Sequence, residues 1–299
     1  MVNVISYEDH FFYPPKWLGL EEVVRFPDGE VKHNSLPNST VWVFKEHEHR
    51  YHPEILADDV GCGMTGFILS DIDHRRAADT ICTFLKRQRI IGGGNHFIDL
   101  CAPIESVTDL HPEPYKVMLI HTHGPDRSTP NIIEEAQEKQ RKAESFRREL
   151  GEELAGLIES PCTLMGDWTH NSVAVENNKV VYRKGVVKVE TGKIYPLPAH
   201  LGAKILLYTI NSGNPPPHSS MPHATGRSGP LGDTKVSATK AEVLRQIVYI
   251  PAEISAQSLR SEHPSCYNSY DKIFRRLRDT NHFFIPLGEM KILSYIGKV

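Results

Sequence analysis

Five short segments of the sequence carry side chains that bind transition metals or react with phosphate. Four of them contain a thiolate, a carboxylate or imidazoles, and the fifth places a histidine beside glycine and arginine. They are Asp59–Cys62, Asn95–Phe97, His121–His123, His170–Asn171 and His223–Arg227. Such donor atoms are the ones that transition metals prefer. The pattern therefore predicts metal-assisted chemistry on a phosphate group.

The first segment can present two ligands from one tight turn. Cys62 follows Asp59 by three residues and lies between Gly61 and Gly63, which permit backbone angles that are closed to other residues. A thiolate can also bridge two cations. By itself, the segment is more typical of a buried structural cysteine, because free cysteines are often found in cores.

Each histidine taken alone is likewise more often a core side chain than a ligand. Their co-occurrence changes this interpretation. Each candidate lies beside glycine, asparagine or threonine in a predicted loop or strand end, and metal sites collect ligands from such separated positions. We therefore expect the segments to meet in one pocket.

Hydrophobic periodicity predicts the elements that must position these segments. The apolar run 117–120 predicts a buried strand ending at His121 and His123, whose side chains share a face because they are two residues apart. Further strands are predicted around 41–44, 65–69, 180–189, 205–208 and 290–296, the 179–195 region as a hairpin or meander, and helices over 77–89, 129–158, 238–248 and 270–278. Residues 211–232 should be irregular, and the charged face of the 129–158 helix should face solvent.

Together these elements predict an α+β protein with mixed strands around a central pocket and helices packed outside. Residues 1–58 show little periodicity and are expected to form a peripheral N-terminal segment. The catalytic domain is expected over residues 59–299.

Composition sets wide limits on function. The chain has 299 residues with 34 Lys and Arg against 37 Asp and Glu, so a net charge of −3 provides no overall attraction to nucleic acid or anionic lipid, although a local basic groove is compatible with it. Its five cysteines lack the close pairing of a secreted disulfide framework. The opening 20 residues lack the apolar core of a signal peptide, and no run approaches the ~20 apolar residues of a membrane span. A soluble, cytoplasmic protein without membrane contact is expected.

In their order along the chain, the segments resemble those of the RtcB family, the manganese- and GTP-dependent RNA-splicing ligases. The resemblance is carried by Asp59–Met64, Gly93–Phe97, the segment at His121, His170–Asn171, Arg183–Gly185, His223–Arg227 and Tyr267. It implies an RtcB-like catalytic domain that joins RNA 3'-phosphate or 2',3'-cyclic phosphate ends to 5'-hydroxyl ends. RNA ends, those of tRNA among them, GTP and an activating protein would be its partners.

The same resemblance implies two metal ions. Asp59, Cys62 and His96 would hold one ion, and Cys62, His121 and His170 the second, with the sulfur shared. Manganese is the ion that the family uses. The donor set also suits zinc, because affinity rises from manganese to zinc in the Irving–Williams order.

Catalysis and nucleotide binding are implied for a further set. His223 would attack the α-phosphate of GTP and form a covalent histidine–GMP intermediate, for which a neutral imidazole nitrogen is a suitable nucleophile. The residues expected to bind nucleotide or phosphate are Asn95, Asp99, Asn171, Gly226, Arg227, Tyr267 and Lys298. Contacts with RNA phosphates are expected from Arg127, Arg183, Lys184 and Arg227.

Departures from the family pattern keep other functions open. The spacings from His121 to His170 and on to His223 are compressed, His123 is new, and Asp99 stands where the family has glutamate. One alternative is a metal-dependent phosphatase or cyclic phosphodiesterase that acts on nucleic-acid ends. Another is a catalytically inactive paralogue that binds RNA or a protein partner.

Overall fold

The computed structural model describes residues 2–8, 12–27, 36–88, 96–104, 114–229, 233–280 and 284–297. Asn95 and Lys298, two of the predicted nucleotide contacts, lie outside the described residues. The strands are β1 Asn3–Ser6, β2 Leu20–Arg25, β3 Thr40–Lys45, β4 Gly63–Ser70, β5 Phe97–Pro103, β6 Tyr115–Thr122, β7 Cys162–Thr169, β8 Asn171–Glu176, β9 Lys179–Lys184, β10 Val186–Lys188, β11 Tyr195–Leu197, β12 Lys204–Ile210, β13 Ser220–Pro222 and β14 Phe284–Gly297. The α-helices are α1 Pro53–Leu56, α2 His74–Gln88, α3 Ile133–Leu157, α4 Ala238–Ala241, α5 Leu244–Ile247, α6 Ala256–Leu259 and α7 Tyr270–Thr280.

Helices and strands both contribute substantially, so the predicted α+β class is confirmed. A seven-stranded sheet has the order β11-β12-β14-β5-β6-β4-β7. Its pairings are all antiparallel. Strands β4 and β6 are buried along almost their whole length. This burial explains the continuous apolar run 117–120, because a strand covered on both faces needs apolar residues at successive positions.

The second sheet contains the N-terminal strands. Its order is β1-β2-β3-β9-β8, with β1 and β2 parallel and the other pairs antiparallel. Strand β3 lies in the middle, and its Trp42 and Phe44 are fully buried. The domain boundary predicted at residue 58 therefore crosses a sheet, since β3 pairs with β9.

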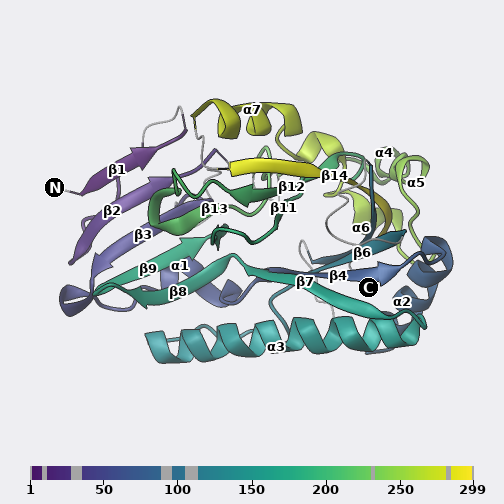
Figure 1. Ribbon diagram of the computed structural model, residues 1–299, viewed down its shortest axis with the longest axis horizontal. Coiled ribbons are helices and arrows are strands. Elements are labelled where there is room, and N and C mark those ends of the chain that lie inside the picture. Colours follow the sequence, from purple (N-terminus) through teal and green to yellow (C-terminus); the bar gives the residue numbers. More distant parts are fainter. Residues whose placement is uncertain are drawn as a thin grey trace.

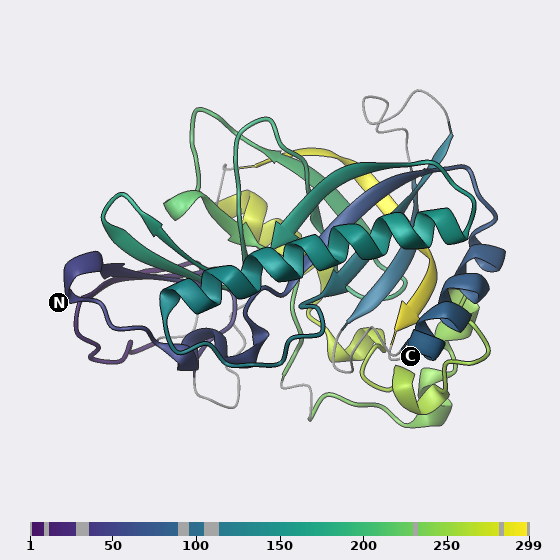
Figure 2. The same ribbon diagram turned by 90° about the horizontal axis from the view of Figure 1, so that it is seen from below.

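The long helix α3 runs along both sheets (Figures 1 and 2). Its 25 residues give a length of about 37 Å, enough to pack on β4 in one sheet and β8 in the other. Ala136, Ala143, Leu150 and Leu154 recur at helical spacing on the buried face, as the sequence predicted. The helix thereby joins the two halves of the fold beneath the site.

Two predicted elements are wrong in detail. The hairpin expected within 179–195 does not form, because β9 pairs with β8 while β10 pairs with β13. Gly185, between β9 and β10, adopts a φ of +65° that redirects the chain from one sheet to the other. The helix expected over 238–248 is divided into α4 and α5, because Val243 N–H bonds the Lys240 carbonyl, three residues back.

Among the described helices, none combines the length and the apolar character needed to cross a bilayer.

Candidate metal centre

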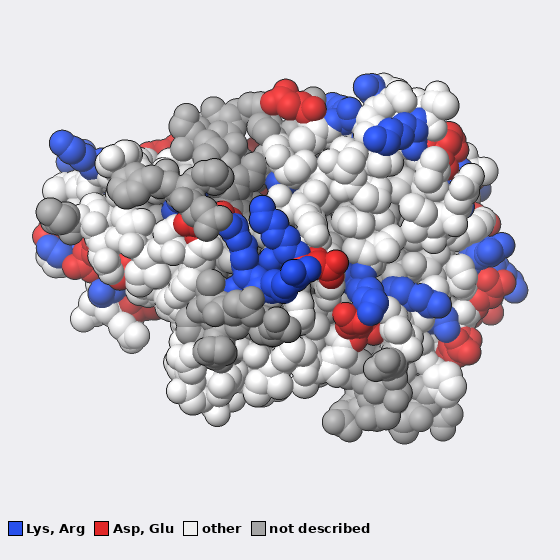
Figure 3. Space-filling view, turned by 90° about the horizontal axis from the view of Figure 1, so that it is seen from above, with Lys and Arg blue, Asp and Glu red and all other residues white. Residues whose placement is uncertain are grey.

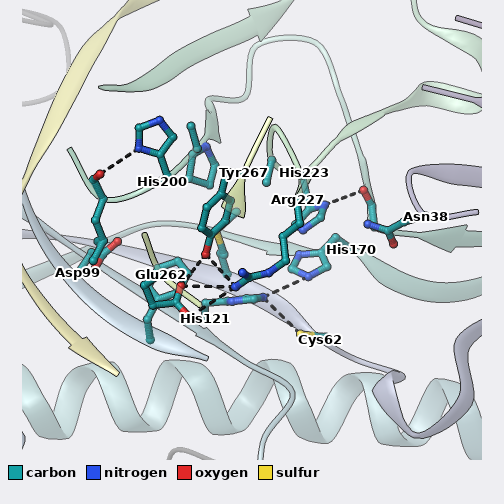
Figure 4. A pocket seen from close by; sticks show the side chains of 18 of the residues that line it. Asn38, Cys62, Asp99, His121, His170, His200, His223, Arg227, Glu262 and Tyr267 are labelled. Atoms are coloured by element: carbon teal, nitrogen blue, oxygen red, sulfur yellow. Dashed lines mark hydrogen bonds and ion pairs between the residues drawn. The ribbon is translucent and has the colours of Figure 1, made fainter. Parts of the chain in front are cut away.

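Strand register brings the candidate ligands to one end of the large sheet. Gly63, the first residue of β4, lies opposite Thr122 of β6 on one side and opposite Thr169 of β7 on the other. Cys62 therefore has His121 and His170 as close neighbours, although these residues are widely separated in the sequence. Figure 4 shows the three side chains turned toward one another.

Cys62, His121 and His170 form a compact buried cluster. The Cys62 Sγ lies 3.4 Å from His121 Nε2, which lies 3.3 Å from His170 Nε2. One potential ligand atom from each residue lies within 4.8 Å of the other two. A thiolate and two imidazoles at this separation can coordinate one transition-metal ion.

Asp59, His96 and His123 form a second cluster with the same 4.8 Å limit. Both histidines are buried, and their ring centroids are 4.6 Å apart. The Cys62 Sγ lies 3.8 Å from His96 Nε2, so the sulfur borders this cluster too. The pKa of His96 is lowered to about 4, mainly by burial and to a smaller extent by the charge of a protonated His123. Its imidazole is therefore neutral, as a metal ligand must be.

The donor set fits a transition metal. Within the described residues, neither His96 Nδ1 nor His123 Nδ1 has a hydrogen-bond partner, although both atoms are buried. Buried polar atoms without partners are uncommon in proteins and indicate a site for a ligand or ion. The predicted ligands Asp59, Cys62, His96, His121 and His170 thus lie together, and His123 joins them.

Buried cations on α3 hold the loop that carries Asp59 and Cys62. The Arg147 guanidinium donates to the Gly61 carbonyl at 2.7 Å, and the Lys139 Nζ donates to the Asp58 carbonyl, also at 2.7 Å. The sequence-based expectation that the charged face of this helix is solvated is therefore wrong for these two residues. The sequence shows that Arg147 and Lys139 are charged, but it does not show that the loop carrying Asp59 and Cys62 packs over them.

Backbone geometry explains the glycine next to Cys62. Gly61 has a φ of +85°, and a Cβ at this position would approach the Ala143 Cβ to 2.9 Å. A side chain here would be strained both by its backbone angle and by contact with α3. The turn can therefore bring Asp59 and Cys62 together only with glycine at this position.

Asn171 links the candidate ligand Asp59 to the neighbouring turn at Gly185. Its Nδ2 donates to Asp59 Oδ2 at 2.8 Å, and its Oδ1 accepts from the Gly185 N–H at 2.7 Å. Both ends of the amide are therefore engaged in orienting Asp59 and the turn. The nucleotide contact expected of Asn171 stays a prediction.

His223 lies against the first cluster. Its ring centroid is 4.1 Å from that of His170, with 30° between the ring planes. The His223 Nδ1 lies 2.7 Å from the Gly185 carbonyl oxygen, which can only accept a hydrogen bond. Nδ1 consequently carries the proton in the neutral ring, and Nε2 carries the lone pair.

A cavity of about 280 Å³ connects these residues with the predicted nucleotide pocket. Its lining includes Cys62, His121, His170, Asn171 and His223, together with Asp99, His200, Gly226, Arg227, Glu262 and Tyr267. In Figure 4, Arg227, Glu262 and Tyr267 lie between Asp99 and the histidine–cysteine cluster. The predicted catalytic and nucleotide residues within the described part of the chain therefore share one cavity.

Asp99 is fully enclosed in this cavity wall. Burial, followed by the nearby Glu262 charge, raises the pKa of Asp99 well above its ordinary value. Its Oδ1 has no hydrogen-bond partner among the described residues. A raised pKa favours the protonated form of this carboxyl group, which offers one donor and one acceptor.

Arg227 is engaged with protein groups in this structure. Its NH2 donates to the Tyr267 hydroxyl at 2.8 Å and lies 3.4 Å from Glu262 Oε1, while its guanidinium lies 4.4 Å above the Tyr267 ring. Tyr267 in turn donates to Glu262 at 2.5 Å. Phosphate binding by Arg227 stays a prediction and would require these contacts to be exchanged.

Sequence reasoning left His123 and Glu262 without roles. The first could have been found, because His123 is two residues beyond His121 and shares its face of the strand. Glu262 follows Ser261 in an irregular segment, and nothing in the sequence indicates its proximity to Arg227.

Comparison of the sequence with models of known protein families and with curated proteins finds no match.

Proposed function

We propose that this protein is a metal- and GTP-dependent RNA ligase of the RtcB type, with a two-metal pocket and His223 as its nucleophile. The observation that carries the proposal is the position of His223. Its Nδ1–H is held by the Gly185 carbonyl at 2.7 Å, and its ring centroid lies 4.1 Å from that of His170 in the candidate metal cluster. A fixed tautomer beside a cation site is what nucleophilic attack on a phosphate requires.

His223 Nε2 would form a bond with the α-phosphorus of GTP while the bond from that phosphorus to the pyrophosphate oxygen breaks. The Gly185 carbonyl stabilises the ring as positive charge develops on it, because it already accepts the Nδ1 proton. GMP then passes from His223 to an RNA 3'-phosphate, and the 5'-hydroxyl of a second RNA end displaces GMP. When bound, two divalent ions, manganese or zinc, would neutralise charge on the phosphates.

Asp59, Cys62, His96, His121 and His170 would hold those ions. A neutral imidazole and a thiolate are the forms in which histidine and cysteine coordinate a metal ion. Asn171 would keep the Asp59 carboxylate in place through its 2.8 Å hydrogen bond. Such outer contacts typically change metal affinity by about 10- to 100-fold when they are removed.

The nucleotide base would enter the part of the cavity next to Asp99. Tyr267 and Tyr295 also line this region, and they provide aromatic surface for a base. A protonated Asp99 could donate to guanine O6 while accepting from N1–H. Gly226, with a φ of +72°, would allow the backbone to approach the nucleotide without a side chain.

Two of the four RNA contacts that the sequence suggested are not at the surface. Arg183 is fully buried and bound to Glu176 at 3.0 Å, and Lys184 is buried as well, so both predicted phosphate contacts are wrong. Figure 3 shows Lys and Arg side chains gathered in the middle of one face, over α7. This helix carries Lys272 and Arg275, which would attract RNA phosphates in a salt-dependent manner.

Incubation with α-labelled GTP and manganese tests the proposal. The wild-type chain should acquire an acid-labile, alkali-stable label, whereas γ-labelled GTP should leave none. His223→Ala should abolish the label. His218→Ala is the matched control, because His218 lies in the same irregular segment but bonds Glu22 outside the cavity.

A label that persists in His223→Ala would refute the assignment of the nucleophile. Hydrolysis of a 2',3'-cyclic phosphate without any GTP requirement would instead identify a phosphodiesterase. A chain that binds RNA but neither divalent metal nor GTP would be an inactive binding paralogue.

A further inference from the structure

We propose that His123 is a metal ligand, and that Asp59, His96 and His123 form a three-residue cation site that does not depend on the sulfur of Cys62. The inference refines the metal centre on which the proposed function rests. The family resemblance assigns Cys62 to both ions and gives His123 no role. The structure groups the donors as two sets of three, and the Cys62 Sγ borders the second set at 3.8 Å from His96 Nε2.

Strand geometry explains why two histidines from one segment serve different ions. His121 and His123 project from the same face of β6 and its continuation, about 6.6 Å apart at two residues' rise. His121 lies with Cys62, whereas the His123 ring lies 4.6 Å from that of His96 at an interplanar angle of 80°. One strand end therefore supplies a ligand to each of two neighbouring cations.

The environment of His123 is that of a ligand rather than of a core side chain. The residue is only 3% exposed, and its Nδ1 has no partner among the described residues. A buried imidazole with a structural role would be expected to use both nitrogens in hydrogen bonds. Its neighbours are another buried histidine, the Asp59 carboxylate and, at Nε2, the Arg127 guanidinium.

Two imidazoles and one carboxylate are a recognised donor set. Such sites leave coordination positions open for water or substrate and suit Zn²⁺, Mn²⁺ and Fe²⁺. The neighbouring Cys62–His121–His170 set is softer because it contains sulfur. The two sites should therefore differ in metal preference, with the harder ion favoured beside Asp59.

Arg127 is the group that loading of this site must displace. Its NH1 lies 2.5 Å from His123 Nε2, and a guanidinium can only donate, so Nε2 accepts and Nδ1 carries the proton. Coordination through Nε2 would take the lone pair that Arg127 uses. Coordination through Nδ1 would move the proton to Nε2, where it faces the Arg127 N–H. Either route breaks the contact, and Arg127 is exposed and can move into solvent.

Metal content per chain tests the proposal without any activity measurement. Protein stripped by a chelator is reloaded with MnCl₂ or ZnCl₂, and the bound ions are counted by mass spectrometry after gel filtration. The wild type should bind two ions, Cys62→Ala one, His123→Phe one, and the double variant none. His200→Asn removes a cavity histidine outside both sets and should keep two.

Cobalt substitution supplies a readout of which ion is lost. In His123→Phe, the thiolate-to-cobalt charge-transfer absorption should persist, and in Cys62→Ala it should disappear while the weaker ligand-field bands remain. Circular dichroism establishes that each variant is folded before its ions are counted.

Two ions in folded His123→Phe, or none in folded Cys62→Ala, would overturn the inference. Labelling by GTP is scored separately. A wild-type chain that binds no divalent ion would overturn the proposed function as well, whereas two ions in His123→Phe would overturn the ligand assignment alone.

Discussion

Replacing Arg147 by methionine should destabilise the protein by about 3 to 5 kcal/mol, because it breaks a buried ion pair on one side only. The Arg147 side chain is completely buried, and that of Asp167 is 5% exposed. The guanidinium binds both oxygens of Asp167, at 2.8 and 2.9 Å. It also donates to the Gly61 and Thr122 carbonyls at 2.7 and 2.9 Å.

The magnitude follows from what the substitution leaves behind. The Asp167 carboxylate stays buried without its cation, and an unpaired buried charge strongly destabilises the folded state. The Gly61 and Thr122 carbonyls also lose a charged hydrogen-bond donor. The methionine side chain recovers only some of the packing of the arginine stem. Adding Asp167→Leu to Arg147→Met should recover at least about 1 kcal/mol, since the two residues are directly coupled.

Urea unfolding measures the effect, and the next residue supplies the control. Arg148 pairs with Glu144 at the surface, with side chains 46% and 40% exposed, so Arg148→Met should cost less than about 0.5 kcal/mol. Arg147→Met should lower the urea concentration at the unfolding midpoint strongly, while the dependence of the unfolding free energy on urea concentration is unchanged. Because Gly61 lies between Asp59 and Cys62, two of the proposed metal ligands, this variant should also bind added manganese more weakly.

Equal midpoints for Arg147→Met and Arg148→Met would refute the reasoning, since burial alone distinguishes these neighbouring arginines. A double variant with Asp167→Leu that is less stable than Arg147→Met would show that the unpaired carboxylate is not the source of the loss.

Three further outcomes are expected. Arg127→Ala should lower the Kd for the ion beside His123, because nothing then competes for Nε2, and a raised Kd in a metal titration would contradict this competition. Asp99→Asn should retain nucleotide binding while Asp99→Leu loses it, because an amide reproduces the donor and acceptor of a protonated acid. Calorimetry measures the binding. Loss of binding in both variants would indicate that Asp99 binds the nucleotide as a carboxylate. Burial, followed by the charge of His52, lowers the pKa of His49 to about 4, so its contribution to stability is present above pH ~6.5 and is lost as the pH falls toward 4. Between these pH values, the free energy of unfolding measured with urea should fall by on the order of 1 kcal/mol less in His49→Gln than in the wild type, for this partly exposed ring. The same dependence on pH in both proteins would refute this expectation.

Local features of the chain could be predicted from the sequence. The run 117–120 predicted β6, and the periodicity after Thr129 predicted α3, since both depend on the spacing of apolar residues within one element. Gly61 and Gly63 indicated a tight turn, and Gly61 indeed has a positive φ. The kinds of donor atom, and hence the expectation of metal chemistry, also follow from residue types alone.

Grouping of those donors was decided only by the tertiary structure. Sheet register places Gly63 between Thr122 and Thr169, and no local pattern specifies how strands so far apart in the chain will pair. For the same reason, the sequence did not indicate that His123 lies beside His96, and the family resemblance gave His123 no role. Burial of Arg147 likewise depends on a loop packing over α3, so its charge predicted contact with solvent, whereas in the fold it contacts Asp167 and the turn that carries Asp59 and Cys62.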